Sequence, residues 1–429
     1  MSGVATRRPT LADLLGTSEF SPMGTPTVRW RVAAVPFLFV LLAACGERVT
    51  RDATIVLDSA GVTIVDNDDR QPAWTLETSW RLSPRPRIQV GNQPDNPDQM
   101  LYRAAHTRRV SDGGIAVANG GMGDVRIFDA GGYYVTRIGF VLDPTVEAPR
   151  PQRVYPIPGD SLLIYLTGGG LSLWDAQYRL RREAEIVQPD APFEGELEPA
   201  GVFDDGSMLI LGRLPPAPAL TGLQRSTLRP MRFGADGRMI DSFGDFPDET
   251  EIMGEGVYVF GPTGYVAAAD STIWYTSAET YELREVARGG RTLRIVRLDR
   301  PLKAVTAADL GAFRVAAVRQ MSDDVGKEAA EATVDSYEYA EFFPTFGQVV
   351  VDELGNIWAL DYKWFDMGSD YQWTVFDAEG RYLGEVAMPY PLTVHQIGAD
   401  YVLGHMSNGR GGEAVYIYRL EKPGAAPGG

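Results

Sequence analysis

Few side chains of this sequence are suited to covalent or metal chemistry. The chain has 429 residues but only one cysteine, Cys45, which excludes an intramolecular disulfide and a cysteine-rich metal centre. The histidines, which are the usual metal ligands and general bases, are His106, His395 and His405. The position of Cys45 is the sharpest signal, because it directly follows an uncharged run, residues 32–44.

This run has the form of a secretory signal peptide, with Arg29 and Arg31 just before it. A helix of its thirteen residues reaches about 20 Å, which is short of the roughly 30 Å hydrocarbon core, so export is favoured over a stable membrane span. Residues 1–28 as a whole fit the pattern poorly, and Met23 is therefore an alternative start to Met1.

The residues around the end of the run resemble the bacterial lipobox, in which small residues admit the peptidase and the cysteine thiol receives the lipid before cleavage. They are Leu42, Ala43, Ala44 and Cys45. The resemblance implies an exported chain that begins at Cys45, with acyl chains such as palmitate holding it to the bacterial cell envelope at the periplasmic or outer-membrane face. Each buried methylene contributes about 0.8 kcal/mol, so several chains make a lasting anchor. The alternative is a cysteine that only happens to end a signal segment.

The chain is strongly acidic, with 57 Asp and Glu residues against 40 Lys and Arg residues and a formal net charge of −17. Such a surface repels nucleic-acid phosphates and anionic lipid headgroups. We therefore expect no nucleic-acid partner, and we expect the lipid rather than charge to hold the protein at the membrane.

The remainder of the chain repeats a short β-rich phrase. In the clearest copy, an Asp-Gly turn and an apolar strand at 112–119 precede a second strand at 125–129 and a third at 134–139. Further copies cover 160–175, 205–244, 270–298 (a degenerate copy), 349–384 and 400–420. Alternating strands bury one side chain in two against neighbouring sheets, while Asp and Gly supply the turn conformations. We therefore interpret the recurring Asp and Gly residues as structural.

The sixth copy lacks its last strand, because the chain ends soon after the apolar segment 415–420. A phrase near the mature N-terminus, 87–91, matches 137–139 in form. We expect 87–91 to pair beside 415–420, which would close a ring of sheets and protect two sheet edges.

These phrases are similar to the six-bladed propellers of the NHL and TolB-like kind, including exported bacterial lipoproteins, over about residues 54–421. The resemblance implies an all-β fold: a six-bladed β-propeller of four-stranded antiparallel blades, its ring closed by an N-terminal strand, with a short helical insertion between blades four and five. It implies architecture more than activity, because the group includes lactonases, lyases, ligand sensors and scaffolds.

The chain then divides into consecutive segments. They are a lipoprotein-type signal peptide at 1–44, a linker at 45–53, an accessory hairpin at 54–79, the propeller at 80–421 with its helical insertion at about 306–341, and a tail at 422–429. The insertion opens on Thr306, a residue type that caps helices, and apolar residues at helical spacing follow it. These are Leu310, Phe313, Ala317 and Met321.

Two histidines are the weak candidates for a site. His106 and His395 precede the first clear strand of copies one and six, so each is expected on an inner strand of neighbouring blades. A divalent metal held by both, with Asp or Glu support, is one hypothesis, and ordinary strand or loop histidines are the alternative. The acidic segments 95–98 and 245–251 carry the oxygen ligands that calcium prefers, with solvated surface loops as the alternative.

No catalytic residue and no firm cofactor follow from the sequence. Arg103, Arg108 and Arg109 carry charge that attracts an anion near the channel mouth, although alternation along a strand directs neighbours to different faces. The favoured function is a binding or scaffold lipoprotein whose loops at one face of the channel hold a protein, peptide or glycan. The alternatives are a metal-dependent lactonase-like hydrolase or lyase with its site in the central channel, and a sensor that binds a small molecule there.

Overall fold

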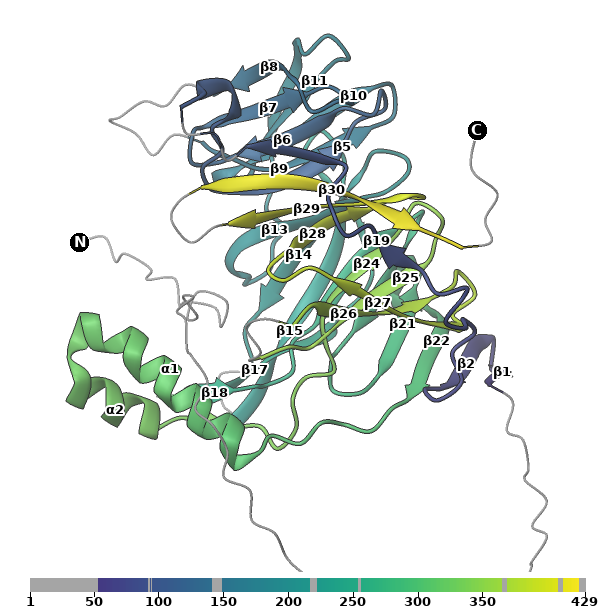
Figure 1. Cartoon of the computed structure of the whole chain (residues 1–429), viewed down its shortest axis with the longest axis vertical. Helices are drawn as coiled ribbons and strands as arrows, with labels where there is room; N and C mark the ends of the chain where they lie inside the picture. Colours follow the sequence, from purple (N-terminus) through teal and green to yellow (C-terminus); the bar gives the residue numbers. More distant parts are fainter. Residues whose placement is uncertain are drawn as a thin grey trace, which may run out of the picture.

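The computed structural model describes residues 53–423 apart from 92, 94, 141–148, 217–221, 254–255, 365–368 and 408–411. The lipobox residues lie outside this described part of the chain. Within it the fold is mostly β-strand with two α-helices (Figure 1). None of the described helices combines the length and the apolar character needed to cross a membrane.

Three sheets follow one another in the first half of the chain. Sheet one contains β5 (Ala104–Arg109), β6 (Ile115–Asn119), β7 (Asp124–Phe128) and β8 (Tyr134–Gly139). Sheet two contains β9 (Pro151–Ile157), β10 (Ser161–Leu166), β11 (Gly170–Trp174) and β12 (Leu180–Glu185). Sheet three contains β13 (Glu194–Val202), β14 (Met208–Leu214), β15 (Gly222–Phe233) and β16 (Met239–Ser242), with β17 (Phe246–Met253) also paired to β15.

Three further sheets combine the second half of the chain with its N-terminal strands. Sheet four contains β19 (Tyr265–Ala269), β20 (Thr272–Thr276), β21 (Glu282–Val286), β22 (Thr292–Asp299), β2 (Val62–Asp68) and β1 (Thr54–Ser59). Sheet five contains β24 (Phe346–Val351), β25 (Ile357–Asp361), β26 (Tyr371–Phe376) and β27 (Tyr382–Met388). Sheet six contains β28 (Thr393–Ile397), β29 (Tyr401–Ser407) and β30 (Glu413–Glu421), to which β4 (Ile88–Gly91) and β3 (Arg81–Leu82) are paired.

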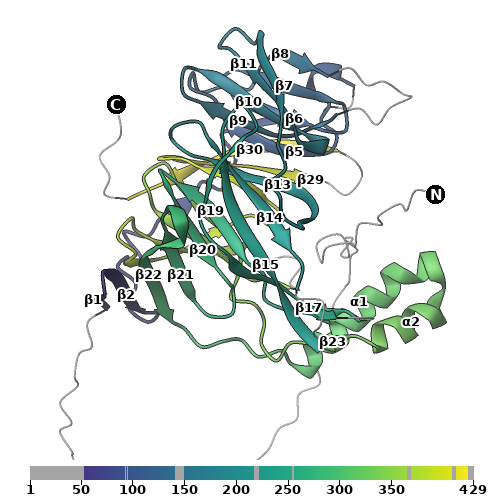
Figure 2. The same ribbon diagram turned by 180° about the vertical axis from the view of Figure 1, so that it is seen from behind.

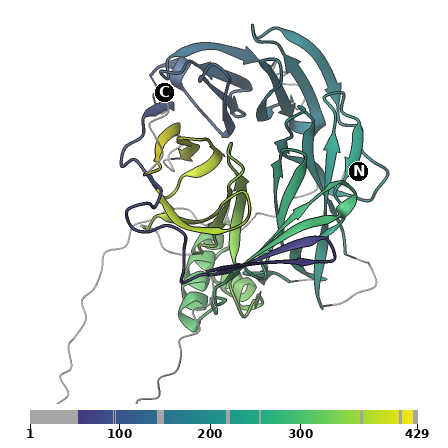
Figure 3. The same ribbon diagram turned by 90° about the vertical axis from the view of Figure 1, so that its right-hand side faces the viewer.

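The first strand of each sheet lies toward a common centre, and we call β5, β9, β13, β19, β24 and β28 the inner strands. Each inner strand contacts the next in this order, and β28 contacts β5. Figure 3 shows the sheets arranged around this centre. The fold is therefore propeller-like, with antiparallel sheets as predicted.

The repeated Asp and Gly residues form the turns that leave the inner strands. In sheet one, the carboxylate of Asp112 accepts a hydrogen bond from the backbone N–H of Gly114 at 2.8 Å. Gly113, between them, has φ of 85°, a conformation that glycine adopts without steric cost. The carboxylate of Asp205 accepts in the same way from the backbone of Ser207. The structural interpretation of these repeats is thus supported by their contacts.

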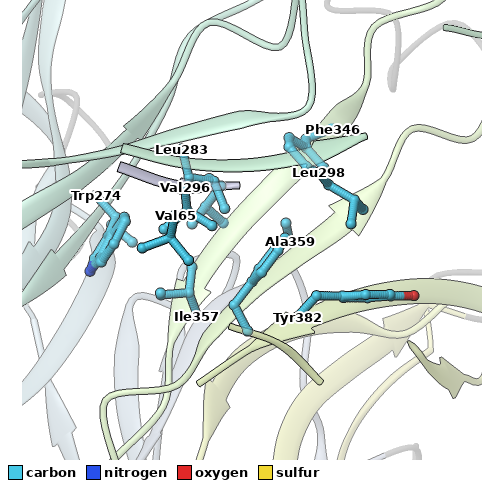
Figure 4. Close-up of a cluster of buried hydrophobic side chains, with 12 residues drawn as sticks. Val65, Trp274, Leu283, Val296, Leu298, Phe346, Ile357, Ala359 and Tyr382 are labelled. Atoms are coloured by element: carbon cyan, nitrogen blue, oxygen red, sulfur yellow. The ribbon is translucent and has the colours of Figure 1, made fainter. Parts of the chain in front are cut away.

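Apolar side chains between adjacent sheets form most of the core. Figure 4 shows the cluster between sheets four and five. Its buried members include Val65, Trp274, Leu283, Val296, Leu298, Phe346, Ile357, Ala359 and Tyr382. Alternate residues of a strand contribute to the clusters on the two sides of its sheet, as Val117 and Ala118 of β6 do.

The predicted pairing between the N-terminal phrase and the last strand is present. β4 runs antiparallel to β30, with Val90 opposite Val415, and both side chains are fully buried. The paired residues of β30 are Ala414–Ile417, which overlap the first part of the predicted segment, and β3 pairs with Leu420 and Glu421 beyond them.

The accessory hairpin forms from β1 and β2, and it extends sheet four at its outer edge (Figure 1). β2 runs parallel to β22, with Val65 opposite Val296. The fourth copy of the repeat is degenerate in sequence, yet with the hairpin it becomes a six-stranded sheet. A strand that pairs parallel to β22 cannot directly follow it through a short turn, so it comes from a distant part of the chain. The residues of the fourth copy alone therefore did not predict the pairing with β2.

Two helices follow β22, as the insertion between the fourth and fifth copies predicts: α1 (Ala307–Val325) and α2 (Lys327–Asp335). Thr306 and Asp309 form a capping box at the start of α1. Phe313 is buried against Phe260 and Trp364, so the predicted stripe faces a core. The helices lie beside β17 and the short parallel pair β18 (Tyr258–Val259) and β23 (Glu338–Tyr339) (Figure 2).

Short 3-10 turns complete the described elements. They are η1 (Pro97–Gln99), η2 (Thr167–Gly169) and η3 (Arg288–Gly290).

Candidate functional site

A cavity of about 840 Å³ lies between the inner strands, and residues from all six of them line it. Its walls carry both polar and apolar side chains. Because inner strands alternate their side chains between the cavity and the sheet's own packing, each strand contributes only a few residues to the lining. This cavity is the place where residues far apart in the sequence can act together.

All three histidines of the sequence meet on one wall of the cavity. His106 lies on β5 and His395 on β28, and their ring centres are 5.1 Å apart in an edge-to-face arrangement. His405, on the neighbouring strand β29, stacks on His395 with its Nδ1 atom 2.7 Å from the Nε2 atom of His395. The sequence placed His106 and His395 on inner strands, but it gave no reason to include His405, which is a second-strand residue.

Irregular pairing directs these histidines. The register between β5 and β6 shifts between Ala104 and His106, and that between β28 and β29 shifts between Val394 and Gln396. Each shift is a β-bulge or similar irregularity of the kind that re-aims a side chain near functional sites. His395 is the residue without a partner in the second shift.

The histidines are held in their neutral form. Burial lowers the pKa of His106 well below 6.5, and the positive charge of Arg108 lowers it further. Burial also lowers the pKa of His395, and His405 adds to that effect. At neutral pH the close nitrogen pair of His395 and His405 is therefore a hydrogen bond between one N–H donor and one unprotonated acceptor.

The metal hypothesis for His106 and His395 stays a prediction. Among the residues that the structure describes, no group of three or more His, Cys, Asp or Glu is arranged to hold a metal ion. Two imidazole nitrogens bound to one zinc ion at about 2.0–2.1 Å each lie about 3 Å or more apart. The 2.7 Å separation of the His395 and His405 nitrogens is instead the distance of a direct hydrogen bond.

Two arginines and a tyrosine extend this wall. Arg108 lies two residues after His106 on β5, and its guanidinium lies over the ring of Tyr155, 5.6 Å from the ring centre. The Nη1 atom of Arg108 is buried and has no hydrogen-bond partner. Arg153, on β9, approaches Glu198 only at 3.7 Å, and the Glu198 side chain is half exposed. The positive charge of this wall is therefore poorly neutralised.

Arg108 and Arg109 separate as strand alternation predicts, whereas Arg103 lies just before β5. Arg108 lines the cavity. The neighbouring Arg109 instead lies over the ring of Tyr401, at 4.6 Å, and Arg103 lies over the ring of Tyr102. Of the three, only Arg108 contributes charge to the cavity wall.

The rest of the lining mixes small apolar residues with carboxylates. The apolar residues include Ala200, Val202, Ala269 and Val350, from β13, β19 and β24, and the carboxylates are those of Glu198, Asp204, Asp270, Glu285, Asp352 and Glu353. A third arginine of the lining, Arg213, differs from Arg108 because its Nε atom donates to the carboxylate of the fully buried Asp248 at 2.6 Å. The cavity therefore has one wall with poorly neutralised positive charge, and the rest of its lining is partly apolar and partly acidic.

The interpretation of 245–251 as an acidic surface loop was wrong. Most of this segment belongs to β17, which pairs with the long strand β15. Its carboxylates are used in ion pairs: Asp245 with Arg229, and Asp248 with Arg213. Acidic residues are uncommon in strands, and the long-range pairing to β15 outweighed this local preference. In the other segment, Asn96 accepts a hydrogen bond from the backbone of Asp98 at the start of η1.

No family model matches this chain, and no curated protein matches it. Solved structures give remote likenesses. A protein from Bacteroides fragilis that is described as exported has 8% identity and a TM-score of 0.44, over 84% of this chain and all of that one. A member of the DUF4221 family from Bacteroides vulgatus has 10% identity and a TM-score of 0.45, over 81% and 99% of the two chains.

A third likeness is to a catalytically inactive virginiamycin B lyase from Staphylococcus aureus, solved with quinupristin. It has 11% identity and a TM-score of 0.36, over 79% of this chain and 88% of that one. At these identities no activity transfers to this chain, and the propeller-like fold is assigned from its own sheets.

Proposed function

We propose that this chain is a membrane-tethered lipoprotein whose six-bladed β-propeller binds a ligand in its central cavity. The observation that carries the proposal is the cavity itself, whose volume of about 840 Å³ lies in the range of roughly 300–1,000 Å³ typical of small-molecule sites. Apolar side chains and placed polar groups both line such sites, and the lining described above contains both, with a larger polar share.

The proposal places the ligand deeper than the sequence did. Loops at one face of the channel were the expected binding surface, whereas the side chains that converge here stand on inner strands. Rigid strands position side chains more precisely than loops do. A small molecule, rather than a protein or glycan partner, is therefore the favoured ligand.

The tether is part of the same proposal. The resemblance of 42–45 to a lipobox supports lipidation of Cys45, and only a short linker separates that residue from β1, which starts at Thr54. The propeller would then lie close to the membrane that holds it. Export to the cell envelope and the six-blade count belong to this proposal as well.

Ligand binding can be tested with a neutral fluorescent probe, phenylnaphthylamine. The chain from residue 46 onward contains every described strand and helix and lacks the proposed site of lipidation. We expect the dye to become fluorescent with this protein, and expect the signal to be lost in Ala200→Trp, which fills the cavity from β13. Ala269→Trp provides a second filled cavity if the first variant does not fold. A dye signal that neither folded variant reduces would contradict the proposal.

A second candidate is a hydrolase or lyase with its site in the same cavity. The gathering of His106, His395 and His405 favours it, because neutral imidazoles can accept a proton from a substrate. The test is hydrolysis of a panel of lactones and esters by the purified protein with added divalent metals, compared with His106→Ala and His395→Ala. Turnover that either substitution abolishes would replace the binding role with the enzymatic one.

A further inference from the structure

The cavity has unequal walls, and this inequality indicates the chemistry of its ligand. Arg108 is the central observation. Its Nη1 atom is buried without a hydrogen-bond partner, and Arg108 has no ion pair within the described part of the chain. A buried donor that has lost its water costs free energy unless it finds an acceptor. An arginine stays charged in proteins, so the missing acceptor is best supplied as a negative charge.

The neighbours of Arg108 increase the local positive charge rather than neutralise it. Arg153 is close enough for its charge to lower the pKa of Arg108, after the larger effect of burial. Both arginines act on the pKa of Tyr155 as well, which shows that the three side chains lie together. The imidazole of His106 beside them is neutral and adds no negative charge.

Glu198 is the carboxylate that approaches this group, and it does not neutralise it. Glu198 approaches Arg153 at 3.7 Å, and its side chain is 52% exposed, so the pair contributes little. Arg213 provides the contrast within the same cavity, because the buried carboxylate of Asp248 binds it at 2.6 Å. The chain thus provides a buried partner for one cavity arginine and leaves Arg108 without one.

We propose that the cavity binds a small organic anion, with its carboxylate, sulfonate or phosphate group on Arg108 and Arg153 and its apolar body against β13, β19 and β24. This inference rests on the proposed function and specifies the ligand class. The planar guanidinium of Arg108 suits such groups because it offers two parallel donors to two oxygens. Tyr155 and His106 lie beside the anion and contribute ring surface to its contact.

The overall negative charge of the protein does not oppose such a ligand inside the cavity. At physiological ionic strength, exposed charges are screened over about 8 Å, whereas buried charges are screened much less. Carboxylates also line the cavity, but none of them is among the groups that shift the pKa of Arg108, so the nearest charge to its guanidinium is that of Arg153.

Two dyes that differ in one charged group test this inference. Anilinonaphthalene sulfonate carries an anion on the same aromatic body as the neutral phenylnaphthylamine. The variants are Arg108→Gln and Arg153→Gln, and the matched control is Arg109→Gln, which removes a charge from the same strand but outside the cavity. Thermal unfolding of each variant shows whether it is folded.

We expect the dissociation constant of the sulfonate dye to rise about tenfold or more in Arg108→Gln, because a hydrogen bond to a charged group contributes about 1.5–3 kcal/mol. Arg153→Gln should weaken the sulfonate dye in the same direction, and Arg109→Gln should not. The neutral dye should bind all three variants as it binds the wild type. If Arg108→Gln does not fold, Arg153→Gln decides, because a folded Arg153→Gln that binds the sulfonate dye as tightly as the wild type would refute the inference.

The possible failures are distinguishable. If Ala200→Trp abolishes binding of the neutral dye while the sulfonate dye is insensitive to Arg108→Gln, the cavity binds ligands but the anion inference is wrong. Equal loss in Arg108→Gln and Arg109→Gln would also refute it. If neither dye responds to a folded cavity-filling variant, both the proposed function and the inference fail.

Discussion

The pairing of β4 with β30 makes Val90 the most informative position for a stability experiment. Val90 comes from the N-terminal part of the chain, yet its side chain is fully buried in the cluster that joins sheets six and one. That cluster includes Leu101, Phe128 and Leu403. Replacing Val90 by Ala should therefore weaken the attachment of the N-terminal strand and the packing of two sheets at once.

The magnitude follows from the two methyl groups that Val90→Ala removes. At about 0.8 kcal/mol each they account for about 1.6 kcal/mol, and the cavity left behind raises the loss of unfolding free energy to about 2 kcal/mol. Val90→Asp would place an unpaired charge in the same cluster, and we expect it to prevent folding.

The matched control is Gln89→Ala. Gln89 lies next to Val90 on β4 and pairs with Tyr416 of β30. Its side chain is exposed, because successive residues of a strand point to opposite faces of the sheet. Its substitution should change the unfolding free energy by less than about 0.5 kcal/mol. Urea unfolding of the chain from residue 46, followed by tryptophan fluorescence, measures both variants. Equal effects of Val90→Ala and Gln89→Ala would refute the burial of β4 between the sheets.

Three further predictions concern the anchor, the histidines and the helical insertion. Cys45→Ser should move the protein from the membrane to the soluble fraction and abolish labelling with palmitate, and a variant that stays membrane-bound would show that the anchor lies elsewhere. Burial lowers the pKa of His106 in the folded protein well below 6.5, the ordinary pKa of a histidine in the unfolded chain. Below pH 6.5 the unfolded chain therefore binds more protons than the folded protein. The stability that the neutral ring contributes is complete above pH 6.5 and is lost as the pH falls toward the folded pKa. The urea midpoint of the wild type should therefore fall more steeply between about pH 7 and pH 5 than that of His106→Asn, and parallel curves would disprove this. Thr306→Ala removes the hydroxyl that accepts from the Asp309 N–H but keeps the backbone N–H that donates to the Asp309 carboxylate. It should cost about 1 kcal/mol of unfolding free energy in the same urea assay, whereas no change would show that the side-chain cap is not stabilising.

The positively charged cavity wall around Arg108 could be predicted only in part. Strand alternation correctly separated Arg108 from Arg109, because the period of two is a local property of any strand. Whether a carboxylate pairs with Arg108 depends on the strands that surround β5. These strands are β9 and β28, and β28 in particular is far away in the sequence. The same limit hid the contact of His405 with His395, which requires the register of β28 on β29.

The sequence by itself determined the features that depend on near neighbours. Asp112 and Gly113 fix a turn through one side-chain hydrogen bond and one positive φ, Thr306 starts a helix through its cap, and apolar alternation marks the strands. Only the tertiary structure decided how these pieces meet: β2 beside β22, β17 beside β15, and three histidines and three arginines around one cavity. The physical reason is that turns and caps are formed by groups a few residues apart, whereas sheet pairing and the burial of charge depend on which distant segments pack together.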